Sequence, residues 1–156
     1  MSTIEKLNTP KNGQHQHILC MYYGLDVIGT EQSVAHATKI PGLIFLSGQT
    51  PVDQSGAVVP GGIKEHTVRV LTSLPNETNS PQTQCIQNLG NVLETAGSSW
   101  EKVVKVNVYL KNMDDFGAMN EVYSELLPTP KPARTCIQAA KLPNDVDVEI
   151  EAIATY

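Results

Sequence analysis

The sequence is poor in charge and has no basic stretch. Charged residues make up 17% of the chain, against about a quarter in an average soluble domain, and the formal net charge is −5. An acidic chain without a run of Lys and Arg repels phosphate backbones, which argues against a general nucleic-acid-binding protein. The low charge content is also consistent with a surface that a partner subunit partly covers.

Long apolar runs are missing as well. No stretch approaches the roughly 20 apolar residues that a membrane-spanning helix needs, and the N-terminus lacks the apolar core of a secretory signal. Glu5, Lys6 and Lys11 stand there without an arginine, which is a weak case for a mitochondrial transit peptide. We therefore expect a cytoplasmic protein that does not contact a membrane, with the mitochondrion as the alternative location.

The familiar cofactor motifs are absent. The chain has no glycine-rich phosphate loop, no paired Cys-x-x-Cys and no His-Glu-x-x-His, so neither a nucleotide nor a metal cofactor is expected. The three cysteines, Cys20, Cys85 and Cys136, lack metal-type spacing, and an odd number makes a poor disulfide framework. We expect them to be reduced thiols.

What remains is the pattern of one small domain. A chain of 156 residues suits a single domain rather than two. Residues 1–32 carry little pattern, and we expect a poorly ordered segment there. Residues 33–156 are expected to form the domain, with an inserted loop at about 67–82, because Pro75 to Pro81 is a strong break in the pattern.

Hydrophobic periodicity predicts the order strand, helix, strand, helix, strand, strand. Short or alternating apolar runs indicate the strands, and apolar residues at helical spacing indicate the helices. Two helices on one face of a mixed sheet, an α+β layer, is the economical architecture for this order. The strands are expected at 43–46, 104–110, 133–140 and 146–155, the helices at 85–96 and 114–127 with Gly97 capping the first, and a loop at 51–63.

Arg134 and Cys136 are candidates for a binding site. A guanidinium cannot lose its charge, so on a partly buried face it must be paired, and its planar fork matches a carboxylate. Arg134 begins the strand at 133–140, and Cys136 lies two residues on, facing the same side. From the pattern alone, an edge arginine paired with a surface acid explains Arg134 equally well.

Two carboxylates are candidates for proton transfer. Glu149 and Glu151 share one face of the last strand, whose other face is apolar. Periodicity alone favours a charged face turned to solvent. The functional alternative is a carboxylate that orients or deprotonates a water molecule, and spacing does not choose between the two residues.

Three further residues could line a site. Asn120 falls on the apolar stripe of its helix, and a buried amide needs partners, so it either caps a backbone group or reaches a site. Ser47 and Gly48 end an apolar strand. Small residues there allow a ligand to approach the backbone closely, although an ordinary turn has the same composition.

Three of these segments, taken in order, match one family. Leu-Ile-Phe-Leu-Ser-Gly-Gln-Thr-Pro at 43–51 is similar to a first signature, and Pro-Ala-Arg-Thr-Cys at 132–136 begins a C-terminal one. That second signature continues with Lys-Leu-Pro at 141–143 and Val-Glu-Ile-Glu-Ala-Ile-Ala at 148–154. In both signatures the chain resembles the RidA/YjgF family of small trimeric imine deaminases.

The resemblance implies an activity and a site. It implies a chorismate-mutase-like α+β fold, a homotrimer with clefts between subunits, and hydrolysis of reactive 2-imino acids to 2-oxo acids and ammonia without a cofactor. It implies that Arg134 holds the substrate carboxylate and that Glu149, rather than Glu151, handles the attacking water. The remaining residues would line or support the pocket: Cys136, the Ser47–Gly48 backbone and Asn120.

The chain also departs from the family pattern. The resemblance covers about 33–156 apart from 67–82, and residues 29–37 lack the Tyr that usually precedes the first signature. The missing Tyr gives weight to an alternative, a non-catalytic binding or chaperone-like trimer that keeps the carboxylate pocket. A ribonuclease, a label that some relatives carry, fits an acidic chain without paired catalytic histidines least well.

Strand pairing bears on where the site is built. A tight hairpin at 142–145 would pair Arg134 near Thr155 and Glu149 near Ala140. At ~3.3 Å per residue the two side chains would then lie on the order of 30 Å apart, too far for one small substrate. Either the two strands are not hairpin neighbours, or Arg134 and Glu149 meet from different subunits. The resemblance favours the second.

Overall fold

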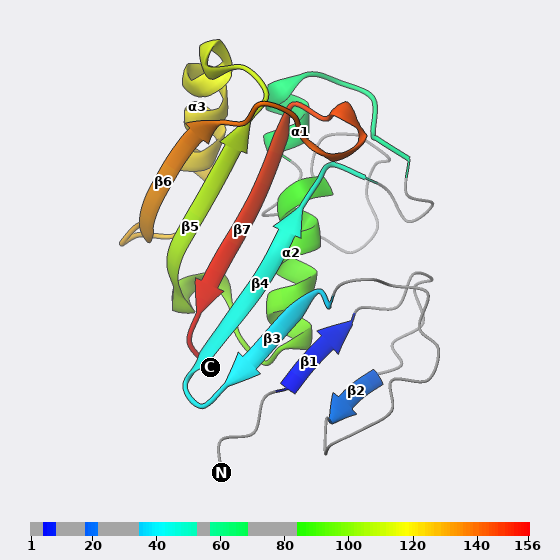
Figure 1. The fold of residues 1–156 in the computed structure, drawn as a ribbon. Helices are drawn as coiled ribbons and strands as arrows, with labels where there is room; N and C mark the ends of the chain where they lie inside the picture. Colours follow the sequence, from blue (N-terminus) through cyan, green and yellow to red (C-terminus); the bar gives the residue numbers. More distant parts are fainter. Residues whose placement is uncertain (1–4, 9–17, 22–34, 53–56, 69–83) are drawn as a thin grey trace, which may run out of the picture.

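One curved, mixed sheet organises the part of the chain that the computed structural model describes, residues 5–8, 18–21, 35–52, 57–68 and 84–156 (Figure 1). Its strand order is β2-β1-β3-β4-β7-β5-β6. The strands are β1 (Glu5–Asn8), β2 (Ile18–Met21), β3 (Ala37–Ile40), β4 (Leu43–Gln49), β5 (Val103–Leu110), β6 (Ala133–Gln138) and β7 (Val148–Ala154). The α-helices are α1 (Ile63–Val68), α2 (Gln84–Thr95) and α3 (Phe116–Leu126).

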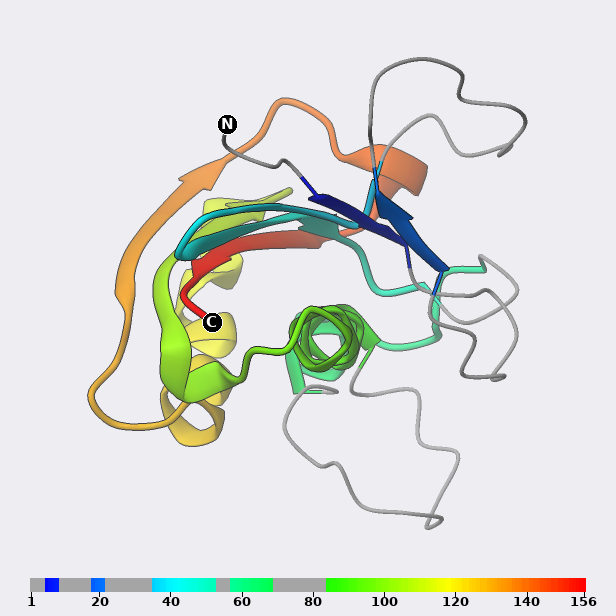
Figure 2. The same ribbon diagram turned by 90° about the horizontal axis from the view of Figure 1, so that it is seen from below.

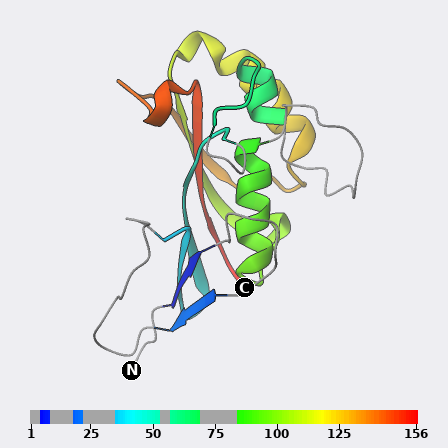
Figure 3. The ribbon, with the colours of Figure 1, turned by 90° about the vertical axis from the view of Figure 1, so that its right-hand side faces the viewer.

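The helices lie on one face of the sheet. Seen along the strands, α2 and α3 both occupy the concave side (Figure 2), and the side view shows no α-helix on the opposite face (Figure 3). The predicted α+β architecture, a mixed sheet with helices on one face, is confirmed. None of the helices among the described residues is long and apolar enough to cross a bilayer.

An aliphatic core fills the space between the sheet and α2. Alternate residues of β4, β5 and β7 point into it, as the period of two in a half-buried strand requires. Ile44, Val106 and Ile150 are fully buried, and Leu89 and Leu93 of α2 pack against them. At ~25 cal/mol per Å² of apolar surface removed from water, this core is the main source of stability.

The end of α2 follows its sequence. Gly97 adopts a φ of 76°, a conformation that costs glycine little. The amides of Gly97 and Ser98 donate to the carbonyls of Glu94 and Leu93 at 2.9 and 2.8 Å, which satisfies carbonyls at the helix end. The predicted glycine cap is therefore confirmed.

Val104 of β5 does not face the side that the alternating sequence pattern predicts. The sequence alternation placed Val104 on the buried face with Val106, but Val104 is 47% exposed. A register shift between Val103 and Lys105 inserts one residue, so that Val103 turns inward in its place. An irregularity of this kind reverses the facing of a residue and leaves no mark in the hydrophobic pattern.

The last two strands are not hairpin neighbours, which is the first of the two alternatives that the sequence analysis left open. Strand β5 lies between them: it pairs in parallel with β6 and antiparallel with β7 (Figure 1). A parallel pair needs a crossover connection, and α3 supplies it between β5 and β6. Arg134 therefore lies opposite Val106 and not near Thr155, and Glu149 lies opposite Tyr109 and not near Ala140.

Two segments of the sequence analysis are only partly covered. Helix α1 begins at Ile63, at the end of the stretch expected to be a loop. The first two residues of the inserted loop expected at about 67–82 belong to this helix, and the rest of that stretch lies outside the described residues. Of the N-terminal segment only β1 and β2 are described; they pair with each other, and β1 pairs with β3. The expectation of a poorly ordered segment stays a prediction for the rest.

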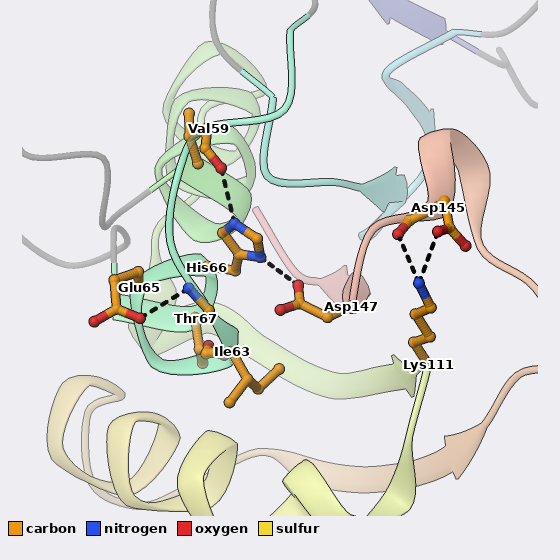
Figure 4. Close-up of polar contacts among 9 residues, drawn as sticks. Val59, Ile63, Glu65, His66, Thr67, Lys111, Asp145 and Asp147 are labelled. Carbon is orange, nitrogen blue, oxygen red and sulfur yellow. Dashed lines mark hydrogen bonds and ion pairs between the residues drawn. The ribbon is translucent and has the colours of Figure 1, made fainter.

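A buried histidine joins α1 to the start of β7 (Figure 4). His66 is 6% exposed. Its Nδ1 pairs with the Asp147 carboxylate, and its Nε2 lies 2.9 Å from the Val59 carbonyl oxygen. Nearby, the Lys111 ammonium donates to the Asp145 carboxylate at 2.7 Å. These contacts fix the segment that leads into Glu149.

Candidate active site

Arg134 lies at the centre of one polar cluster. From β6 its Nη1 donates to the Oδ1 of Asn120 on α3 at 2.7 Å. Its guanidinium carbon sits 4.5 Å from the centre of the Tyr123 ring and 5.5 Å from that of Phe116, within range of cation–π attraction. We call these residues, with the neighbouring Cys136, the arginine cluster.

The guanidinium in this cluster has no carboxylate partner among the described residues, since the ion pairs found there involve other cations. It borders a shallow pocket of about 230 Å³. The ammonium of Lys131, which also borders the pocket, donates to the Ser124 carbonyl at 2.6 Å, again a neutral acceptor. The pocket is lined by Asn120, Tyr123, Ser124, Lys131, Pro132 and Arg134, so two cations and no acid face it.

Cys136 packs against the core and is not among the residues that line the pocket, where the sequence analysis expected it. Burial raises the pKa of its thiol, with the Arg134 charge acting in the opposite direction. A thiol whose pKa is raised stays protonated at neutral pH, and the thiolate is the nucleophilic form. Cys136 is therefore not suited to attacking a substrate.

A second cluster lies on the face of the sheet that carries no helix. Glu151 of β7 accepts hydrogen bonds from Asn107 Nδ2 at 2.7 Å and from the Tyr109 hydroxyl at 2.9 Å, both from β5. Glu149 lies on the same face, two residues earlier and opposite Tyr109. Gly48 of β4 completes this group, which we call the carboxylate cluster.

Gly48 lets the Glu149 carboxylate reach the backbone of β4. A Cβ at this position would stand 1.9 Å from Glu149 Oε1, so any side chain would displace the carboxylate. The close approach occurs where the pairing of β4 with β7 shifts register between Leu46 and Gln49. The position of the Glu149 side chain thus requires a glycine at residue 48.

The Glu149 carboxylate is not held by hydrogen-bond donors among the described residues, in contrast to that of Glu151. Desolvation by burial raises the pKa of Glu149, and the charge of Glu151 raises it further. A carboxylate without such donors and with a raised pKa is suited to accept and return a proton. The structure thus offers a physical distinction between two residues that spacing could not separate.

Ser47 is engaged in holding the strand end. Its hydroxyl donates to the Ala35 carbonyl at 2.6 Å, and its amide donates to the His36 carbonyl at 2.9 Å. Both groups tie β4 to the segment before β3. Of the predicted pair, Gly48 contacts the carboxylate cluster and Ser47 stabilises the backbone beside it.

The two clusters lie on opposite faces of the sheet. The alternation along β7 buries Val148 and Ile150 against the helices and turns Glu149 to the other side, whereas Arg134 points at α3. Along β5, their partners Val106 and Tyr109 are three residues apart, about 10 Å. The sheet itself lies between the guanidinium and the carboxylate.

Sequence reasoning found most of these residues and missed two. It singled out Asn120 and Arg134, which the structure joins by a hydrogen bond. It did not single out Asn107 and Tyr109, which are polar residues of an alternating strand. Their position opposite the two glutamates depends on β5 lying beside β7, which a local pattern does not reveal.

Metal ligands do not gather in either cluster. Across the residues that the structure describes, no three His, Cys, Asp or Glu side chains are placed to hold a metal ion. The polar groups present are a guanidinium, carboxylates, amides and a phenol. They can bind a carboxylate and transfer protons by themselves.

Fold and site together define a class: a small α+β protein with, among its described residues, a guanidinium without a carboxylate partner on one face of the sheet and a carboxylate without a hydrogen-bond donor on the other. A model of the family described as endoribonuclease L-PSP matches residues 72–156. The chain belongs to this family, which is the RidA/YjgF family that its signatures resemble, and that prediction is confirmed.

Individual relatives agree over most of the chain. Protein mmf2, mitochondrial, of Schizosaccharomyces pombe is 50% identical over 121 residues, which is 76% of this chain and 83% of the relative. The 2-iminobutanoate/2-iminopropanoate deaminase of Mus musculus is 38% identical, covering 77% and 78%. The solved structure of E. coli TdcF with bound serine is 27% identical, with a TM-score of 0.65 over 82% of this chain and 91% of that one.

Proposed function

We propose that this protein hydrolyses reactive 2-imino acids to 2-oxo acids and ammonia. The observation that carries the proposal is the Arg134 guanidinium, which Asn120 and Tyr123 hold in place and which has no carboxylate partner among the described residues. A fixed guanidinium with free N–H groups matches a carboxylate. The mouse relative named as a deaminase and the bound serine of TdcF, itself a 2-amino acid, support the same ligand chemistry.

Glu149 is the proposed proton carrier. Its carboxylate accepts a proton from water as the water oxygen bonds to the imine carbon and the C=N double bond becomes single. Glu149 passes this proton to the nitrogen, which gives a carbinolamine. Glu149 then takes the proton of the carbinolamine hydroxyl group and passes it to the nitrogen as the C–N bond breaks, so that ammonia leaves and the C=O double bond of the 2-oxo acid forms. One water is consumed and Glu149 is regenerated, so the reaction needs no oxidant, reductant or cofactor.

Imine hydrolysis makes modest demands on a catalyst. Imines hydrolyse readily in water, so positioning the carboxylate and relaying a proton supply enough acceleration. The arginine cluster would supply the first and the carboxylate cluster the second. This division of roles does not depend on the tyrosine that the family usually carries before its first signature.

The opposite facing of the two clusters supports a site built between subunits. Arg134 of one subunit and Glu149 of the next would meet across an interface of a homotrimer, as the family resemblance implies. The bare face of the sheet carries apolar residues suited to such an interface, since Phe45 is 41% and Ile137 48% exposed. The reason to expect an interfacial site is therefore the opposite facing of the two clusters, and not a hairpin of the last two strands, which does not form.

The direct test is a coupled assay. Purified protein is added to 2-iminopropanoate generated in place by an amino-acid oxidase, and the release of ammonia or 2-oxo acid is followed against the uncatalysed rate. Faster release supports the proposal. Binding of 2-oxo or 2-amino acids without faster release would favour the non-catalytic carboxylate-binding alternative, and RNA cleavage that survives repurification would favour the ribonuclease.

A further inference from the structure

The carboxylate cluster contains a second acid whose position is fixed by its neighbours. Glu151 accepts hydrogen bonds from Asn107 at 2.7 Å and Tyr109 at 2.9 Å through the same oxygen, Oε1. Two donors on one oxygen hold the carboxylate in a single orientation. Such an arrangement keeps a negative charge at a defined place on this face of the sheet.

Glu149 is the group nearest to that charge along the strand. Residues two apart on a strand share a face and lie about 7 Å apart, so Glu149 and Glu151 are side by side on β7. Tyr109 stands directly opposite Glu149 in the ladder, yet its hydroxyl reaches diagonally to Glu151. The Tyr109 hydroxyl, which could have donated a hydrogen bond to Glu149, therefore donates to Glu151 instead.

We infer that Glu151 is a positioning residue for Glu149: Asn107 and Tyr109 fix its carboxylate beside Glu149 and donate to it alone, so that the Glu149 carboxylate stays free to exchange a proton. The inference rests on the proposed deaminase for the use made of that proton. A like charge nearby disfavours ionisation. Glu149 therefore keeps its proton to higher pH than it would without Glu151, and can return it to the departing nitrogen.

The groups around Glu149 support this assignment. Its own strand contributes Glu151 and, in the other direction, Asp147, which is paired with His66 of α1. Strand β5 contributes Tyr109, whose pKa the hydrogen bond to Glu151 raises, so that it stays a neutral donor. Strand β4 contributes Gly48, which carries no titratable group. Desolvation is the larger cause of the raised pKa of Glu149, and the charge of Glu151 is the second cause.

The test is a titration of Glu149 that does not depend on catalysis. The intact protein is labelled with ¹³C at the glutamate side-chain carboxyl carbon, and the Glu149 resonance is assigned by its loss in Glu149→Gln. In Glu151→Gln its titration midpoint should fall by about one pH unit. Tyr109→Phe should move it in the same direction but less, and Glu151→Asp, which keeps the charge, should leave it nearer the wild-type value.

Glu101→Gln is the matched control, because it removes the same charge at an exposed site beyond the other end of β7 and should leave the midpoint unchanged. If deaminase activity is present, the acidic limb of the kcat profile should shift with the NMR midpoint. An unchanged or higher midpoint in Glu151→Gln overturns the inference. If Glu151→Gln does not fold, an unchanged midpoint in Tyr109→Phe overturns the inference. A shifted midpoint in a protein without deaminase activity would overturn the proposed function alone.

Discussion

The arginine cluster and the carboxylate cluster hold their charged groups in different ways. Arg134 is fixed on three sides, by the Asn120 amide and by two aromatic rings, and is left open toward the pocket. Glu149 is packed against the Gly48 backbone and has no hydrogen-bond donor among the described residues. The first arrangement gives a rigid receptor for an anion, and the second a group free to exchange a proton.

This difference separates binding from chemistry in space. Within one chain the sheet keeps the guanidinium and the Glu149 carboxylate apart. The neighbour of Glu149 on its own strand is another carboxylate, and burial and the like charge of Glu151 raise the pKa of Glu149. In the proposed trimer the two clusters would come together only at an interface.

The largest expected effect tests the arginine cluster. Arg134→Ala should lower kcat/KM by about tenfold to over a hundredfold, since a hydrogen bond to a charged group contributes about 1.5–3 kcal/mol. Arg134→Lys, which keeps the charge but not the planar fork, should recover only part of the loss. Steady-state rates with 2-iminopropanoate, beside circular dichroism to confirm folding, measure this. Full activity in Arg134→Ala would remove the cluster from the site.

The carboxylate cluster is tested by a change at its backbone contact. Gly48→Ala places a Cβ where Glu149 Oε1 now lies, so kcat should fall by roughly tenfold, because a displaced catalytic group loses its alignment. Gly117→Ala on α3 is the control, as its Cβ would meet nothing within 4 Å, and it should keep full activity. Equal rates in the two variants would show that the position of Glu149 does not matter.

The sequence was informative wherever a local pattern decides the outcome. The stripe of α2, its Gly97 cap and the alternation of β7 follow from spacing alone, and the structure agrees with each. Strand neighbours are a long-range property, and here sequence reasoning failed: nothing local to 133–155 indicates that β5 lies between the last two strands.

The site residues also divide into those that a local pattern reveals and those that depend on long-range contacts. Arg134 and Asn120 could be proposed because a charged and a polar residue stood on apolar faces, where they need partners. The choice of Glu149 over Glu151 came from the resemblance and not from the pattern. The structure supplies the physical difference between them, in donors from β5 that reach only Glu151.

A mixing experiment asks whether the two clusters work across an interface. Arg134→Ala and Glu149→Gln proteins, each with strongly reduced activity, are unfolded and refolded together. In a ring-shaped trimer with random assembly, about a quarter of the interfaces would receive both intact residues, so about a quarter of the wild-type activity should return. Either protein refolded alone is the control. No recovery, in mixed trimers verified by native mass spectrometry, would place both residues in a site within one chain.

The smallest expected effect concerns stability, and it contrasts Glu149 with an exposed acid. The folded-state pKa of Glu149 is raised by desolvation and by Glu151, so its ionised form is disfavoured in the fold. The wild-type protein therefore loses stability as pH rises from the unfolded-state pKa through the folded one. Glu149→Gln lacks this loss, and its Tm relative to wild type should increase between about pH 4 and about pH 7.

Glu101 should behave in the opposite way in the same measurement. The hydrogen bond from Ser99 lowers the pKa of Glu101, so the ionised form is favoured in the fold, and the stability it contributes is present above the unfolded-state pKa and lost as pH falls. The Tm of Glu101→Gln relative to wild type should therefore decrease between about pH 4 and about pH 7. Thermal scans of both variants at both pH values decide the matter. The Tm difference for Glu149→Gln could instead stay constant with pH, or change in the same direction as that for Glu101→Gln. Either result would show that Glu149 ionises without penalty in the folded protein. The contrast between the fixed Arg134 charge and a free, proton-exchanging Glu149 carboxylate would then be wrong.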